Sequence, residues 1–164
     1  MTEPAKFGFL VITDIKTELF GVVKALNASG IPYALCGGLA VVLHGYPRAT
    51  QDIDLLILPD DYAKVKSAVA PLGFRFEATP MTFKAGQPEE QKIMRISKIV
   101  DEDALMLDFV LADGFLRKVW ENRQAYVIEG MEIVAVDRDG LITMKKASGR
   151  TKDLADLEQL PSDD

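Results

Sequence analysis

Cysteine and histidine are nearly absent from this 164-residue chain, which has one of each, Cys36 and His44. One cysteine cannot form a disulfide within the chain, and so few soft ligands argue against a zinc centre. No apolar run approaches the roughly 20 residues of a membrane-spanning helix. The run at residues 7–12 is also too short for the apolar part of a signal peptide. We therefore expect a cytoplasmic protein with no membrane partner.

Basic residues are the minority charge, with 19 Lys and Arg against 25 Asp and Glu and a formal net charge of -6. This balance argues against tight, sequence-independent binding of nucleic acid, which needs clustered Lys and Arg. The excess of carboxylates could in part serve a hard cation. Hydrophobic residues make up 48% and charged residues 27% of the chain, which is typical of a globular domain.

The order of hydrophobic patterns predicts an α/β (α+β) fold, a mixed β-sheet flanked by helices. We expect one domain over 1–164, with a core at about 30–136 and closing helices at 137–160. Thr13 or Asp14 can cap the first helix. The expected helices are 14–29, 39–43, 62–72, 114–123, 137–148 and 151–160. The expected strands are 32–36, 52–58, 74–78, 92–100, 104–111, 125–128 and 131–136. Residues 79–90, with two prolines and a glycine, are expected to form a mobile surface loop.

Two carboxylates, Asp52 and Asp54, open the strand DIDLLIL. Residues two apart in a strand project to the same face, so the two side chains should stand side by side. Like charges at that distance repel unless a cation lies between them. The pair therefore suits a divalent metal bound to a nucleotide phosphate. The plain alternative is a solvated strand end.

A third carboxylate, Asp108, interrupts the apolar run ALMLDFVL. A buried charge is costly unless it is paired or binds a metal. Asp108 should therefore lie at a sheet edge or reach a cation. If its strand neighbours that of Asp52 and Asp54, the three carboxylates converge and can hold two magnesium ions.

Several other residues allow both a functional and a structural interpretation. Gly37 and Gly38 could let phosphates approach the backbone, or could simply form a turn. Arg48 and Thr50 could contact a phosphate or base, or brace their loop. Lys145 could lie near a triphosphate or on a solvated helix face. Three groups favour the structural interpretation: His44 as a helix end, Cys36 as a small buried side chain, and residues 115–120 as core or interface.

The order of these features resembles the nucleotidyltransferase superfamily that includes DNA polymerase beta. Gly37-Gly38, a short helix, Arg48-x-Thr50-x-Asp52-Ile-Asp54 and the later Asp108 carry the resemblance. It is strongest to the small bacterial branch, which includes AbiEii-type toxins, minimal nucleotidyltransferases and antibiotic nucleotidyltransferases. The segment LITMKKASGRTKDLAD at 141–156 is similar to the closing helices of that branch. The resemblance covers roughly residues 30–160.

The resemblance implies transfer of a nucleoside monophosphate from an NTP, such as ATP, to an acceptor hydroxyl, with release of pyrophosphate. Asp52, Asp54 and Asp108 would be catalytic and would bind two Mg²⁺ ions, with Mn²⁺ as a substitute. Asp108 would also activate the hydroxyl. The nucleotide-binding residues would be Gly37, Gly38, Arg48, Thr50 and Lys145. Many members carry Ser directly after the first Gly, whereas this chain has Gly38, which removes one hydroxyl contact to phosphate.

The acceptor is left open by the sequence: a small molecule such as an antibiotic, an RNA 3′ end or a protein side chain. A partner protein or a second copy of the chain could complete the acceptor site. Two alternatives to an independent enzyme are a partner-dependent toxin–antitoxin or defence module and a degenerate nucleotide-binding copy. The presence of all three carboxylates argues against the degenerate copy.

Overall fold

A computed structural model describes residues 15–160, and the expected capping residues Thr13 and Asp14 lie outside this range. Its helices are α2 (Ile15–Ala28), α3 (Gly37–Leu43), α4 (Tyr62–Val69), α5 (Leu116–Glu121), α6 (Arg138–Ser148) and α7 (Thr151–Gln159). Single 3₁₀ turns flank α4 at Pro59–Asp61 and Ala70–Leu72. The strands are β1 (Ala34–Cys36), β2 (Asp52–Ile57), β3 (Phe76–Glu77), β4 (Met81–Phe83), β5 (Gln91–Val100), β6 (Asp103–Leu111), β7 (Gln124–Ile128) and β8 (Met131–Ala135).

The strands form one mixed sheet in the order β3-β5-β6-β2-β1-β8-β7, and β4 pairs with β5 near its start. The central strands β2 and β6 are parallel, whereas β1 and β5 are antiparallel to their neighbours β2 and β6. The expected α/β class with a mixed sheet is confirmed. Because β2 and β6 are adjacent, the strand of Asp108 does neighbour that of Asp52 and Asp54.

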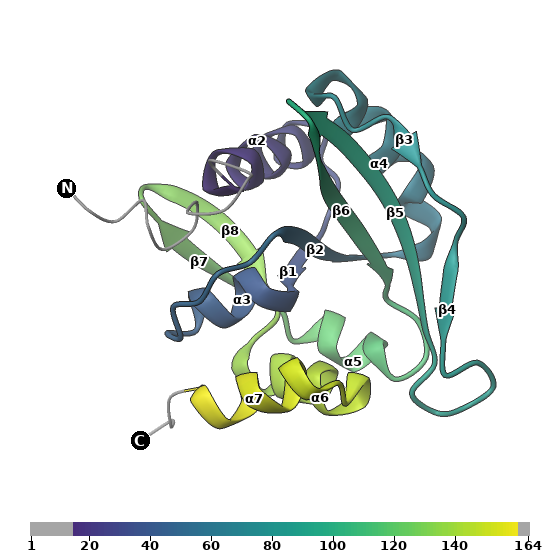
Figure 1. Ribbon diagram of the computed structural model, residues 1–164, viewed down its shortest axis with the longest axis vertical. Coiled ribbons are helices and arrows are strands. Elements are labelled where there is room, and N and C mark those ends of the chain that lie inside the picture. The colour runs from purple at the N-terminus through teal and green to yellow at the C-terminus, as the bar shows by residue number, and fades with distance from the viewer. Residues whose placement is uncertain (1–14, 161–164) are drawn as a thin grey trace.

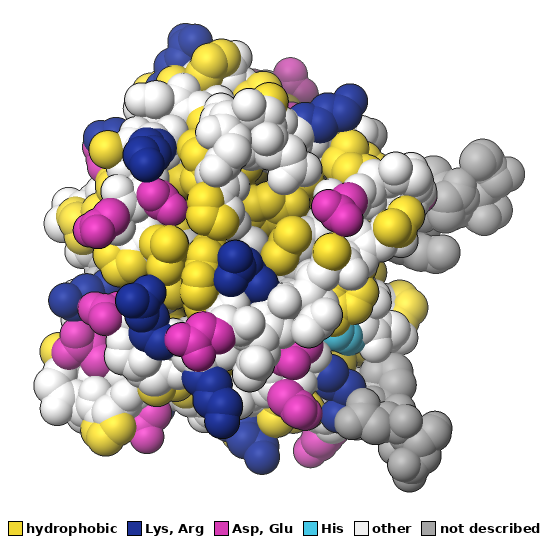
Figure 2. Space-filling view, turned by 180° about the vertical axis from the view of Figure 1, so that it is seen from behind, with side chains coloured by type: hydrophobic (Ala, Val, Ile, Leu, Met, Phe, Trp, Pro, Cys, Tyr) yellow, Lys and Arg dark blue, Asp and Glu magenta, His cyan; other side chains and the backbone are white. Residues whose placement is uncertain are grey.

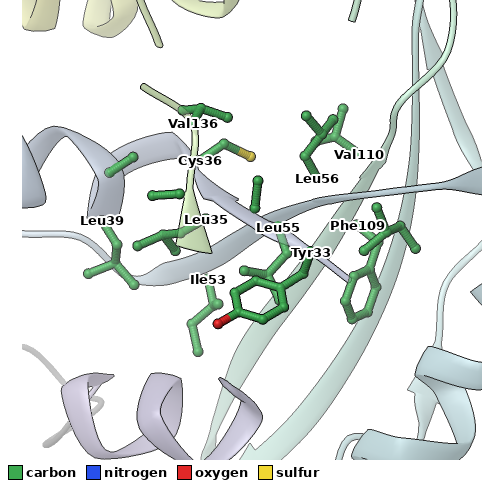
Figure 3. Packing of buried hydrophobic residues seen from close by; sticks show 14 of the residues in the cluster. Tyr33, Leu35, Cys36, Leu39, Ile53, Leu55, Leu56, Phe109, Val110 and Val136 are labelled. Carbon is green, nitrogen blue, oxygen red and sulfur yellow. The ribbon is translucent and has the colours of Figure 1, made fainter. Parts of the chain in front are cut away.

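Side-chain alternation along the central strands separates an apolar face of the sheet from a polar one. Leu55 and Phe109 lie on the apolar face with Tyr33, whereas Cys36 and Val110 lie on the opposite face (Figure 3). Helices α2 and α4 contact each other on one side of the sheet, and α5, α6 and α7 gather at another (Figure 1). Aliphatic side chains of β2 and β6 are completely buried, and their close packing holds the two strands that carry the carboxylates rigidly in place.

One expectation about secondary structure is wrong. Residues 79–90 are not a continuous loop, because Met81–Phe83 pairs in antiparallel register with the start of β5. The neighbouring strand supplies the backbone hydrogen-bond partners, which no local pattern of this segment could show. The short helix α3 also begins two residues earlier than expected, at Gly37.

The surface carries charges of both signs. On the face in Figure 2, basic and acidic side chains are interspersed around hydrophobic side chains at its centre. Within residues 15–160, no helix is long and apolar enough to cross a membrane. Leu116, Val119 and Trp120 are buried in the core, so the structural interpretation of residues 115–120 is confirmed.

Candidate active site

The centre of the polar face is a row of side chains in register across four strands. Arg95 of β5 lies opposite Asp108 of β6, Asp108 opposite Asp54 of β2, and Asp54 opposite Cys36 of β1. Neighbours in such a row have Cβ atoms about 5 Å apart. Asp52 lies two residues before Asp54 on the same face. The structure therefore brings together the three carboxylates that the sequence predicted.

Asp54 has the most perturbed carboxyl group of the site. Burial raises the pKa of Asp54 to about 7, and the charges of Asp108 and Asp52 add to the effect. Burial and Asp108 also raise the pKa of Asp52. Within residues 15–160, neither side chain has a hydrogen bond or ion pair to a protein group. Two crowded carboxylates without partners are suited to receive a cation.

Asp108 differs from this pair because it already has a partner. Arg95 Nε donates to Asp108 Oδ1 at 2.7 Å, and Arg95 Nη2 donates to Asp108 Oδ2 at 2.9 Å. Only 8% of the Asp108 side chain is exposed, against 31% for Arg95. This bidentate pair satisfies the expectation that Asp108 reaches a cation, but the cation is a guanidinium. Sequence reasoning missed Arg95, because nothing in its own strand pattern marks it and only the strand pairing places it here.

Gly37 is required by the packing of Asp54. Its backbone has φ +67°, a left-handed conformation that favours glycine. An added Cβ would lie 2.1 Å from Asp54 Oδ2 and 2.8 Å from Asp54 Cβ. The carboxylate therefore occupies the space that any other residue at 37 would fill.

Gly38 is in close contact with the loop before β2. An added Cβ there would lie 2.7 Å from Thr50 Oγ1 and 3.2 Å from Arg48 Nη2. The Thr50 hydroxyl thus occupies the place where a side chain at position 38 would begin. This finding gives a physical reason for glycine at the position where many superfamily members carry Ser.

Lys145 is buried rather than solvated, which excludes the solvated-face interpretation. Only 6% of its side chain is exposed, and its Nζ lies 3.2 Å from Asp153 Oδ1 and 2.9 Å from Asp156 Oδ2. Asp156 also pairs with Arg48 Nε at 2.9 Å, and Asp153 with Arg150 Nε at 2.7 Å. Two carboxylates of α7 therefore hold three basic side chains in place. These ion pairs join the last helix to the body of the protein.

Arg48, Lys145 and Arg150 line a cavity of about 270 Å³ together with the carboxylates of Asp52 and Asp54. Its lining includes Gly37, Gly38, Arg48, Thr50, Asp52, Asp54, Lys145, Arg150 and Lys152. All five residues predicted to bind nucleotide are thus beside two of the predicted catalytic carboxylates. A second cavity of about 230 Å³ adjoins at Gly37, Asp54 and Arg150 and is lined largely by apolar side chains, among them Phe83, Ile93 and Met144.

The polar face has no ready-made metal centre. Within the described part of the chain, no group of three or more His, Cys, Asp or Glu side chains is arranged to hold a metal ion. Asp52 and Asp54 nevertheless fit a divalent ion, because they are oxygen donors without protein partners. Cys36 does not add a ligand, because burial, with the nearby Asp54, raises the pKa of its thiol well above the usual value. His44 caps the end of α3 as expected, and its Nε2 lies 3.0 Å from the Val136 carbonyl oxygen.

Comparison with known proteins identifies the family. The family model for aminoglycoside-2''-adenylyltransferase matches residues 18–160. No curated protein sequence matches the chain. A crystal structure of a candidate nucleotidyltransferase from Thermotoga maritima is 15% identical, with a TM-score of 0.61, covering 91% of this chain and 93% of that one. The structure of ANT(2'')-Ia in complex with adenylyl-2''-tobramycin is 14% identical, with a TM-score of 0.54, covering 88% of this chain and 86% of that one. Both structures share the fold of this protein, and the family match over most of its length shows that the chain belongs to the aminoglycoside-2''-adenylyltransferase family, in the antibiotic-type branch of the nucleotidyltransferase superfamily.

Proposed function

We propose that the chain transfers a nucleoside monophosphate, from ATP or a related NTP, to a hydroxyl of a small-molecule acceptor. The observation that carries the proposal is the placement of two carboxylates, Asp52 and Asp54, in a cavity with four basic side chains, although neither carboxylate has a hydrogen bond or ion pair within residues 15–160. Arg48, Lys145, Arg150 and Lys152 line that cavity. A carboxylate pair suits a divalent ion and the basic side chains suit phosphate oxygens, which together match a metal-bound triphosphate.

The reaction divides among these residues according to their charges. Arg48, Lys145, Arg150 and Lys152 would bind the triphosphate, with Thr50 as a hydroxyl donor. Asp52 and Asp54 would hold a divalent ion, Mg²⁺ or Mn²⁺. When bound, this ion neutralises charge on the transferred phosphoryl group. Asp108 would accept the proton of the acceptor hydroxyl, whose oxygen forms a bond to the α-phosphorus. The bond from that phosphorus to the bridging oxygen breaks, and pyrophosphate leaves.

A small-molecule acceptor is favoured over RNA by the surface. The chain has a net charge of -6, and charges of both signs alternate on the face in Figure 2. The second cavity, about 230 Å³ and largely apolar, adjoins Asp54 and offers space for the part of a substrate that carries no phosphate. The complex of ANT(2'')-Ia with an adenylylated antibiotic makes an antibiotic-like hydroxyl compound the first acceptor to test.

Calorimetric titration of each NTP in the presence of Mg²⁺ or Mn²⁺ tests the first step. We expect metal-dependent binding to wild type and at least tenfold weaker binding to an Asp52→Asn/Asp54→Asn variant. A variant with the exposed Asp60 and Asp139 changed to Asn has the same net charge and should bind like wild type. Equal binding by all three proteins would refute the proposal.

Transfer itself is tested with NTP labelled at the α-phosphorus and a panel of hydroxyl compounds that includes tobramycin. We expect label to move to an acceptor with release of pyrophosphate, and Asp108→Asn to abolish transfer while leaving NTP binding intact. NTP binding without transfer to any acceptor, alone or with a partner chain, would favour the degenerate nucleotide-binding copy.

A further inference from the structure

The Arg95 guanidinium occupies the side of Asp108 that faces away from Asp54. It faces Asp108 across the β5–β6 pairing and donates to both of its carboxylate oxygens, at 2.7 and 2.9 Å. Asp108 in turn lies opposite Asp54 on the other side. An ion shared by Asp54 and Asp108 would thus sit one strand away from a fixed positive charge. Like charges at such a distance repel strongly in a partly buried site.

The charge of the site points to the same conclusion. When all three are ionised, as they would be beside a divalent ion, Asp52, Asp54 and Asp108 carry three negative charges, and Arg95 cancels one of them. The two that remain equal the charge of a single divalent ion. Of the other cations that act on Asp54, Lys145 is already paired with Asp153 and Asp156, and Lys152 is exposed to solvent, which screens its charge. The row of carboxylates is therefore balanced by one ion together with Arg95.

We propose that Arg95 is a positioning residue that holds Asp108 out of metal coordination and limits the carboxylate site to one divalent ion, bound by Asp52 and Asp54. This inference rests on the proposed function, because it assumes that the carboxylate pair binds metal. It assigns Asp108 a different role from a shared metal ligand. A carboxylate has about four lone-pair positions, and Arg95 uses two of them. The others remain available to accept the proton of the acceptor hydroxyl.

The fixed orientation of Asp108 follows from its surroundings. Its side chain is almost completely buried, and the two parallel hydrogen bonds of a guanidinium fix the plane of the carboxylate. Arg95 remains charged at all relevant pH values, because its hydrogen bonds to Asp108 raise the pKa of Arg95 further. A lysine at position 95 would keep the charge but lose the two-point contact.

Counting bound Mn²⁺ separates one ion from two. Free Mn²⁺ is titrated by electron paramagnetic resonance in the absence of nucleotide, with wild type, Arg95→Gln, Arg95→Lys and Arg75→Gln. Arg75 is exposed and its guanidinium donates to the Ala70 carbonyl oxygen, so its variant controls for the lost charge. We expect one ion per chain in wild type, Arg95→Lys and Arg75→Gln. In Arg95→Gln we expect a second ion, bound at least about tenfold more tightly than any second ion in wild type.

A second variant keeps the test decisive if Arg95→Gln folds poorly. The double variant Arg95→Gln/Asp108→Asn removes one charge of each sign, so the affinity for the single Mn²⁺ should stay within about threefold of wild type, because Asp108 is not its ligand. A loss of about tenfold or more would show that Asp108 coordinates the ion and would overturn the inference. Two ions in wild type, or an unchanged count in a folded Arg95→Gln, would overturn it as well.

The failure of this inference is distinguishable from failure of the proposed function. Two Mn²⁺ ions in wild type, with NTP binding still dependent on Asp52 and Asp54, would overturn the role of Arg95 alone. If neither wild type nor Arg95→Gln bound Mn²⁺, and NTP binding were unchanged by replacing Asp52 and Asp54, both the role of Arg95 and the proposed function would be overturned.

Discussion

Replacement of Gly37 by alanine should damage the site far more than the same replacement at Gly30. The two glycines share the same backbone conformation, with φ +67°. Alanine in this left-handed region costs about 1–2 kcal/mol at either position. Around Gly30 nothing lies within 4 Å of an added Cβ, whereas at Gly37 the added atom would meet Asp54 at 2.1 to 2.8 Å. The comparison therefore separates the backbone cost from the steric cost.

The steric cost at Gly37 should appear in both stability and binding. The contact includes Asp54 Cβ, which cannot move without the strand, so overpacking adds about 1–3 kcal/mol to the backbone cost. We expect Gly30→Ala to lose about 1–2 kcal/mol of unfolding free energy in urea and Gly37→Ala about 2–5 kcal/mol. Gly30→Ala should bind Mn²⁺ and NTP like wild type, and Gly37→Ala at least tenfold more weakly. Equal unfolding free energies and unchanged binding in the two variants would refute the tight packing of Gly37 against Asp54.

Three further predictions concern charge and packing. Because the pKa of Asp54 is about 7 rather than 3.8, the native state binds more protons between these pH values, so unfolding free energy without metal should fall as pH rises. The fall is at most about 4 kcal/mol between pH 4 and 8, and Asp54→Asn should remove most of it in urea unfolding with EDTA. Lys145→Met should cost about 3–5 kcal/mol in the same assay, because two buried carboxylates lose a partner; a cost as small as that of exposed Lys146→Met would contradict this. Gly38→Ala should weaken NTP binding by displacing Thr50 Oγ1. Adding Thr50→Ser to this variant should restore little of the binding, since the hydroxyl itself makes the close contact. Full restoration would show that the Thr50 methyl group is the obstacle.

Local sequence was a good guide wherever the signal depended on neighbours along the chain. The alternation of Asp52 and Asp54 placed both on one face, and the apolar run around Asp108 indicated a buried strand. The expectation that Asp108 lies at a sheet edge or reaches a cation followed from the cost of an isolated charge, and its bidentate contact with Arg95 meets the second alternative. The glycine pair was recognised, but only the structure shows that Asp54 fills the space beside Gly37.

The remaining features depend on contacts between distant segments. Residues 81–83 form a strand only because β5 lies beside them, and Lys145 is buried only because α7 brings Asp153 and Asp156 against it. The fold class and the three carboxylates could be predicted from the amino-acid sequence, because periodicity and the cost of burying charge are local properties. The cation that Asp108 contacts could not, because Arg95 reaches it through a strand pairing that no spacing along the chain encodes.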